Sequence, residues 1–153
     1  MNTEITGAGF VIYFNNRQKT ISSYPQDIIY LVLINNKDEY DFNKGTIDQY
    51  EIPFDCAVRE TYEESGLKYK KNYLLHRTPS KTFSDGLEMF IGEYILDFND
   101  LHMQPDLTKN ISITPNINGI IEHKGFSWET YENARNKLPD YLKEVIDWAK
   151  NNI

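Results

Sequence analysis

Apolar residues in the first third of the chain form short runs or alternate with polar residues, which is typical of β-strands. Residues 7–14 (GAGFVIYF) predict one strand, and the unbroken apolar run at 28–34 (IIYLVLI) predicts a strand that is buried on both faces. Similar patterns predict strands at 40–43, 72–76 and 87–97. The chain is therefore expected to be built around a β-sheet.

A helical period first occurs at residues 53–65. Pro53 suits the first turn of a helix, Asp55 favours the positive end of the helix dipole, and Gly66 is the expected stop. These signals predict one helix in the middle of the chain.

A second helical period covers residues 131–153, where Pro139 predicts a break. The segment SWET has the form of a partial capping box, so this helical region is expected to begin with Ser127 as its cap. The stretch 110–121 is β-branched but contains proline and glycine, which predicts an irregular strand or a loop. Together the elements predict a mixed sheet with helices, in an α/β or α+β domain.

Length and charge limit the function. A chain of 153 residues is expected to form a single domain, residues 1–153. Its net charge of -7 argues against the broad basic face that binding of duplex DNA requires. The one basic cluster, Lys68, Lys70 and Lys71, indicates either a solvated loop or a contact to phosphate or RNA.

The sequence also predicts where the protein resides. It contains no apolar run near the ~20 residues that cross a membrane, and its first residues lack the pattern of a secretion signal. The single cysteine, Cys56, excludes an intrachain disulfide and is expected to be a small packing residue. We therefore expect a soluble cytoplasmic protein without a membrane partner.

The predicted helix at 53–65 gathers negative charge on one face. Glu60, Glu63 and Glu64 stand at i, i+3 and i+4, so their carboxylates point to the same side of the helix. Like charges at this spacing repel, and no lysine lies within the turn to relieve them. Taken alone, the pattern is more typical of a solvated acidic face than of a site for Mg²⁺ or Mn²⁺, the hard cations that take carboxylate and carbonyl oxygens.

The residues before this helix support a metal site. Gly45 permits a bend that could turn its carbonyl toward an ion, and Glu51 and Arg59 can form an ion pair that ties the loop to the helix.

Residues 45–67 resemble the Nudix box, G-x5-E-x7-R-E-U-x-E-E-x-G-U, where U is an apolar residue. Eight residues fall at the specified positions: Gly45, Glu51, Arg59, Glu60, Glu63, Glu64, Gly66 and Leu67. Three positions depart from the pattern. Thr61 occupies the first U position, Tyr50 stands where a glycine often precedes the first glutamate, and Asn43 replaces the proline of the common Pro-Lys-Gly sequence.

The resemblance implies an α/β/α sandwich with a mixed β-sheet between helices, and hydrolysis of a nucleoside diphosphate linked to another moiety. The metal ligands that it implies are three carboxylates and one carbonyl, those of Glu60, Glu63, Glu64 and Gly45. It also implies a structural ion pair of Glu51 with Arg59, and it places Arg59, Glu63 and Glu64 in the catalytic set. Clustered divalent ions would neutralise the phosphate charge and activate a water.

Residues 119–138 are similar to the distal part of animal-type diadenosine tetraphosphate hydrolases. That similarity implies a further catalytic carboxylate at Glu122, as base or metal ligand, and a base-stacking position near Phe126; His123 is a loop histidine or a phosphate contact. The residues expected to bind substrate are two lysines and two aromatics, Lys44, Lys81, Phe83 and Phe126. Tyr94 is a further candidate for the cleft, although aromatic residues on strands belong to the core in most cases.

The first functional hypothesis is a Mg²⁺- or Mn²⁺-dependent pyrophosphohydrolase of dinucleoside polyphosphates, with a small-molecule nucleotide as its partner. Capped RNA is the alternative, supported by the lysine cluster alone. Diphosphoinositol phosphates would need more basic residues, and a non-catalytic nucleotide-binding module would be expected to have lost box glutamates. The sequence leaves the oligomeric state open.

Overall fold

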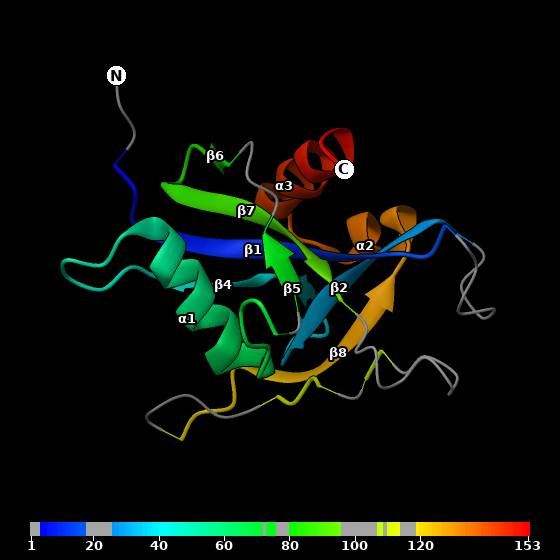
Figure 1. Cartoon of the computed structure of the whole chain (residues 1–153), viewed down its shortest axis with the longest axis horizontal. Helices are drawn as coiled ribbons and strands as arrows, with labels where there is room; N and C mark the ends of the chain where they lie inside the picture. Colours follow the sequence, from blue (N-terminus) through cyan, green and yellow to red (C-terminus); the bar gives the residue numbers. More distant parts are fainter. Residues whose placement is uncertain are drawn as a thin grey trace.

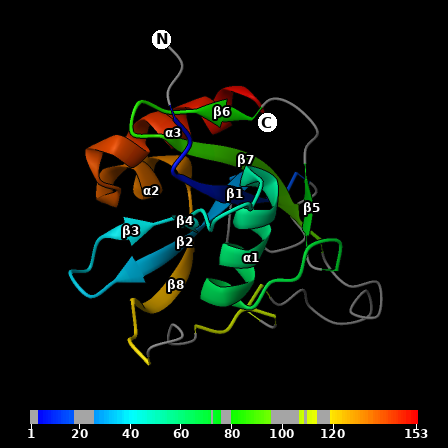
Figure 2. The same ribbon diagram turned by 90° about the vertical axis from the view of Figure 1, so that its left-hand side faces the viewer.

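The structure is a computed structural model that describes residues 4–17, 26–71, 73–75, 80–95, 107–108, 110–113 and 119–153. A twisted sheet lies between helix α1 (Pro53–Ser65) on one side and helices α2 (Tyr131–Lys137) and α3 (Asp140–Asn151) on the other (Figures 1 and 2). This α/β arrangement is the one expected from the sequence.

Within the described residues, eight strands form one mixed sheet. Their bounds are β1 Gly7–Asn15, β2 Ile28–Asn35, β3 Tyr40–Asp41, β4 Asn43–Thr46, β5 Tyr73–Leu75, β6 Lys81–Thr82, β7 Leu87–Tyr94 and β8 His123–Glu129. The main order is β3-β2-β1-β7-β5; β4 pairs with β1, β6 with β7 and β8 with β2. Strands β1 and β7 are parallel, and the other pairs are antiparallel.

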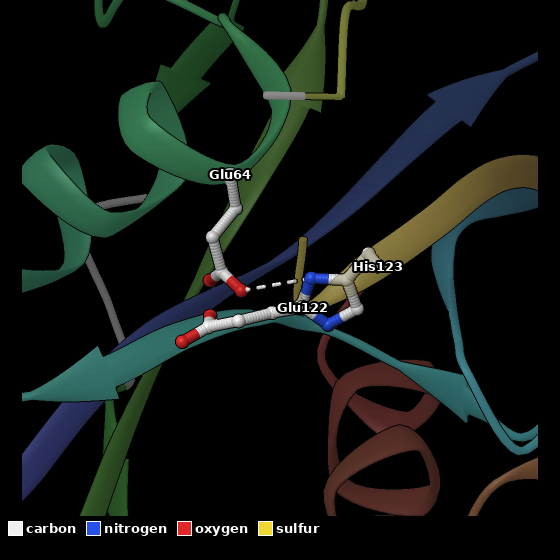
Figure 3. A group of neighbouring side chains, drawn as sticks. All are labelled: Glu64, Glu122 and His123. Carbon is white, nitrogen blue, oxygen red and sulfur yellow. Dashed lines mark ion pairs between the residues drawn. The ribbon is translucent and has the colours of Figure 1, made fainter. Parts of the chain in front are cut away.

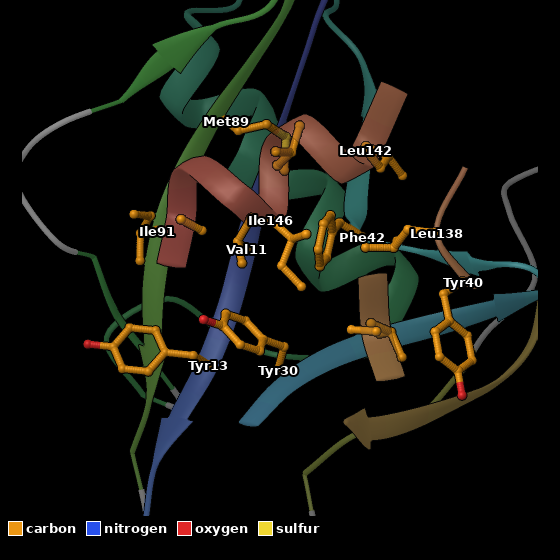
Figure 4. Close-up of a cluster of buried hydrophobic side chains, with 14 of the residues drawn as sticks. Val11, Tyr13, Tyr30, Tyr40, Phe42, Met89, Ile91, Leu138, Leu142 and Ile146 are labelled. Carbon is orange, nitrogen blue, oxygen red and sulfur yellow. The ribbon is translucent and has the colours of Figure 1, made fainter. Parts of the chain in front are cut away.

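Side chains of the central strands alternate between two cores. On β1, Phe10 and Ile12 pack in the cluster beneath α1, whereas Val11 and Tyr13 pack beneath α2 and α3 (Figure 4). Strand β2 contributes to both clusters in the same way, and most of its residues are buried. The prediction that 28–34 forms a strand buried on both faces is therefore confirmed.

Helix α1 begins and ends as its sequence predicts. Pro53 occupies the first helical position, and Gly66 ends the helix in the left-handed conformation with φ of 76°, its N–H donating to the carbonyl of Tyr62. Cys56 is buried in the core against the sheet, as expected of a packing residue.

The expected start of the last helical region is wrong. Ser127 lies in β8 opposite Val32 of β2, and it is Thr130 that caps α2 by accepting from the N–H of Asn133 at 3.2 Å. The break at Pro139 is confirmed, because this residue separates α2 from α3.

Several strands are shorter than the sequence predicts. The stretch 40–43 is divided at Phe42 into β3 and β4, and β7 ends at Tyr94. The described parts of 110–121 contain neither helix nor strand. None of the described helices is long and apolar enough to cross a membrane.

Candidate active site

A bidentate ion pair joins the loop after β4 to helix α1. Arg59 donates from Nε and Nη2 to the two carboxylate oxygens of Glu51, each at 2.9 Å, and its Nη2 also donates to the carbonyl of Thr46 at 3.1 Å. These hydrogen bonds from Arg59 lower the pKa of Glu51 to about 2. The loop is thereby held against the helix by a charge-assisted fork.

The carboxylate of Glu60 occupies the space above Gly45. A Cβ added at Gly45 would lie 2.1 to 2.4 Å from the carboxylate atoms of Glu60, so any side chain at this position would displace them. Burial raises the pKa of Glu60, although Arg59, which donates to it from Nη1 at 2.9 Å, acts in the opposite direction. Glycine is thus required here for the close approach of the helix.

The other two implied carboxylates of α1 differ in exposure. Glu63 is 54% exposed and lies 3.1 Å from Nη1 of Arg59. Glu64 is only 7% exposed; its Oε1 accepts from the backbone N–H of Lys44 at 2.7 Å. Burial raises the pKa of Glu64 to about 9, even though the hydrogen bond from Lys44 lowers it. A buried carboxyl of this kind is suited to a cation.

A fourth carboxylate, that of Glu122, reaches Glu64 from another segment of the chain. Glu122 immediately precedes β8 and is exposed. Glu64, Glu122 and His123 each offer one ligand atom, and these atoms lie within 4.8 Å of one another (Figure 3). The fold therefore brings a helix residue and a residue 58 positions later in the chain to one point.

His123 and Asp41 belong to the same cluster, although no pattern in the sequence indicates a role for Asp41. The Nδ1 atom of His123 lies 3.3 Å from Oε2 of Glu64, and its Nε2 lies 3.0 Å from Oδ2 of Asp41. The other oxygen of Asp41 is 3.1 Å from Nζ of Lys44. Both ring nitrogens of the buried His123 thus face carboxylates, and its role as a phosphate contact stays a prediction.

The carbonyl of Gly45 is the fourth implied ligand. Its oxygen lies 3.6 Å from Sγ of Cys56, whose thiol donates to it. The role of the Gly45 carbonyl as a metal ligand stays a prediction.

Lys44 and Gly45 also line a pocket of about 310 Å³ on the side of α3. The other lining residues come from four segments: Thr6, Gly7, Thr46, Asp85, Leu87 and Tyr141. The Nζ atom of Lys44 lies 5.7 Å from the centre of the Tyr141 ring. A cation and an aromatic ring are therefore held together next to the carboxylates.

Not all of the other residues expected to bind substrate lie in the pocket of Lys44 and Tyr141. Phe83 is 7% exposed and packs edge to face against Trp148 of α3, at 5.8 Å between ring centres; its role in substrate binding stays a prediction. Tyr94 is buried against Trp128 in the core. Lys81 is exposed on β6, and Phe126 is half-buried on β8; their roles stay predictions.

Known proteins match this chain in structure but not in sequence. No model of a protein family matches the chain, and no curated protein matches its sequence.

Solved structures resemble it over nearly its whole length. A C. elegans Ap4A hydrolase in a binary complex superimposes with a TM-score of 0.67 at 17% identity, covering 95% of this chain and 96% of that one. A hydrolase described as NUDIX from Listeria monocytogenes has a TM-score of 0.60 at 19% identity and covers 97% of both chains. The NUDIX domain of Shewanella oneidensis NrtR, complexed with ADP ribose, has a TM-score of 0.58 at 10% identity and covers 99% of this chain and 90% of that one.

Proposed function

We propose that this chain, which has the fold of Nudix hydrolases, is a divalent-metal-dependent pyrophosphohydrolase that cleaves a phosphoanhydride bond in a nucleotide substrate. The observation that carries the proposal is the convergence of the carboxylates of Glu64 from α1 and Glu122 from the segment before β8, with the carboxylate of Glu60 on the same helix beside Gly45. A fold alone does not determine an activity, whereas a convergent set of oxygens at one point restricts the chemistry.

The residues present fit a hard divalent cation. Glu64 has a buried carboxyl whose pKa burial raises to about 9, and a bound cation would favour its charged form. Asn43, next to Lys44, has a buried carboxamide oxygen without a partner among the described residues. All of these donors are oxygens, which Mg²⁺ and Mn²⁺ prefer over sulfur.

The ligands would be the carboxylates of Glu60 and Glu64, with Glu63 and Glu122 at the open side of the site. An ion held there would neutralise phosphate charge and make the attacking water more acidic. Glu122 is exposed and is the residue we assign to accept the proton of the attacking water. Arg59 keeps Glu60 and Glu63 in place, since its Nη1 donates to both. The water oxygen bonds to one phosphorus, the bridging P–O bond breaks, and the leaving phosphate carries away the electron pair.

Dinucleoside polyphosphates are the proposed substrate class. The pocket beside Gly45 presents Lys44 for phosphate and Tyr141, which is 44% exposed, as a surface on which a base can stack. Two structural neighbours, an Ap4A hydrolase and a NUDIX domain complexed with ADP ribose, support a nucleotide substrate for this chain.

Capped RNA is the second candidate. Its support is the basic cluster after α1, where Lys68 lies over the ring of Tyr62 and Lys70 over the ring of Tyr69. A stacked lysine and aromatic pair is suited to single-stranded nucleic acid. The net charge of -7 weighs against a long RNA, so this candidate comes second.

The proposal is tested with a panel of dinucleoside polyphosphates, nucleotide sugars, capped RNA and diphosphoinositols, in Mg²⁺ and in Mn²⁺, with products identified by mass. We expect cleavage of dinucleoside polyphosphates to two nucleotides. Glu64→Gln should lower kcat by more than about a hundredfold with an unchanged circular dichroism spectrum, while the exposed Glu144→Gln on α3 should not. No cleavage of any member, or full turnover by Glu64→Gln, would overturn the proposal; preference for long capped RNA would reverse the order of the two substrates.

A further inference from the structure

Asn43 on β4 contains a buried polar atom that the fold leaves without a partner. The residue is 1% exposed, and its Oδ1 makes no hydrogen bond within the described part of the chain. An acceptor in this state destabilises the folded protein, and such atoms usually have a water or an ion as their partner. No other buried side-chain oxygen or nitrogen among the described residues is in this state.

The register of β4 with β1 places this side chain on the face of the sheet that α1 covers. Asn43 is directly opposite Phe10, and Gly45 is directly opposite Ala8. Residues opposite one another in an antiparallel pair point to the same face. Phe10 contacts Phe54 of α1 edge to face at 6.2 Å between ring centres, so the carboxamide of Asn43 also faces α1.

Helix α1 runs antiparallel to β4, so later residues of the helix lie over earlier residues of the strand, in the direction of Asn43. Glu60 lies above Gly45. One turn later, about 6 Å along the helix axis, Glu64 accepts from the N–H of Lys44, the residue that follows Asn43. Asn43 in turn lies about 7 Å along the strand from Gly45. The distance from Glu60 to Glu64 along the helix is therefore similar to the distance from Gly45 to Asn43 along the strand. This brings the carboxamide of Asn43 to the level of the buried Glu64 carboxyl.

We propose that Asn43 supplies a further oxygen to the divalent cation site, as a partner of the ion or of a water bound to it. The inference rests on the proposed function, because it assigns a residue to the same site. Amide carbonyl oxygens are ordinary ligands of hard cations. An ion held by Glu64, or a water on that ion, is the partner that the Oδ1 atom of Asn43 lacks.

If Asn43 supports the ion, its replacement should have opposite effects on two properties, the stability of the metal-free protein and the affinity for Mn²⁺. A purely structural residue would not show this combination. Replacing Asn43 by Leu, of similar volume, removes the unsatisfied oxygen, so the metal-free protein should unfold at a higher temperature. The same change removes an oxygen from the site, so Mn²⁺ should bind about tenfold more weakly or worse, the effect found for residues that support metal ligands. Asn43→Asp keeps an oxygen at this position and should retain the Mn²⁺ affinity.

The test is Mn²⁺ binding to the full chain, measured by electron paramagnetic resonance of free Mn²⁺ and by titration calorimetry, with no substrate present. Thr61→Val is the matched control, because Thr61 is a buried polar residue of α1 whose hydroxyl already donates to the carbonyl of Ala57 at 2.7 Å; its Mn²⁺ affinity should equal that of the wild type.

Three outcomes of the Mn²⁺ titration test the assignment of Asn43 separately from the proposed function. Weaker Mn²⁺ binding by Asn43→Leu, with Asn43→Asp and Thr61→Val near the wild type, supports the assignment. If Asn43→Leu binds Mn²⁺ as the wild type does, the assignment is wrong and the proposed function stands. If the wild type itself does not bind Mn²⁺, the proposed function is wrong as well. Should Asn43→Leu fail to fold, Asn43→Ser takes its place with the same expected loss of affinity.

Discussion

Binding of a divalent ion to the metal-free protein should release about one proton at pH 7. Burial raises the pKa of Glu64 to about 9. At pH 7, about two units below this value, roughly 99% of the molecules hold the proton. A carboxyl must lose its proton to act as a metal ligand, so each bound ion displaces this proton. Glu60, whose pKa burial also raises, adds to the release.

The same proton determines how stability depends on pH. The unfolded chain loses it near 4.5, whereas the folded, metal-free protein keeps it up to about 9. Between these values the folded state binds more protons, so the stability of the metal-free protein falls as the pH rises, by up to about 1.4 kcal/mol per pH unit. Metal binding removes this trend, because Glu64 then carries no proton in the folded state either, and the apparent affinity for Mn²⁺ should rise by up to about tenfold per unit from pH 6 to 9.

Calorimetric titration with Mn²⁺ in two buffers that differ in ionisation enthalpy measures the number of protons released. Glu64→Gln is the matched variant, because its amide has no proton to lose; its proton count should fall toward the contribution of Glu60 alone. A wild-type protein that binds Mn²⁺ at pH 7 with a proton count near zero, and with an affinity independent of pH, would refute the reasoning from the burial of Glu64.

Two further predictions concern the loop between β4 and α1. Gly45→Ala places a Cβ within 2.4 Å of the Glu60 carboxylate and should lower Mn²⁺ affinity by more than about tenfold, measured by calorimetry; an unchanged affinity would show that Glu60 can move without loss. Arg59→Lys loses the bidentate fork to Glu51 and should lower the free energy of unfolding in urea by about 1–3 kcal/mol at pH 7. Because the pKa of Glu51 in the folded protein is about 2, below its ordinary 4.5, this difference should be complete above pH 4.5 and shrink as the pH falls toward 2; a difference independent of pH would contradict the ion pair.

The parts of the fold that the sequence predicts correctly are those with local causes. Helix α1 begins at Pro53 and ends at Gly66 because proline and glycine fix the backbone at those residues themselves. The apolar run of β2 reflects cover on both faces. Ser127 was placed wrongly because its segment reads locally as a cap, whereas pairing of β8 with β2, about 95 residues earlier in the chain, makes it a strand.

In the candidate site too, the sequence predicts what depends on local spacing and does not predict contacts between residues far apart in the chain. Spacing within one helix places Glu60 and Glu64 on one face, and the sequence predicts this correctly. The contact of His123 with Asp41 joins residues 82 positions apart, and it depends on the registers of β3 and β8 on β2. Neither residue carries a sequence signal for that contact beyond the position of His123 next to Glu122. A single sequence cannot specify such a register, because alternative alignments of apolar strands look equally good.

The four residues of strand β4 make contacts on both sides of the sheet. Asn43 and Gly45 face α1, whereas the side chain of Lys44 reaches Tyr141 at the start of α3. The backbone N–H of Lys44 nevertheless donates to Glu64 on the α1 side, and its Nζ contacts Asp41, which holds His123 against the same Glu64. A phosphate drawn to Lys44 in the pocket would therefore compete with Asp41 for the ammonium group. We therefore expect that a phosphate bound on the α3 side would change the position of Glu64 on the other side, through the contacts of Asp41 with Lys44 and His123.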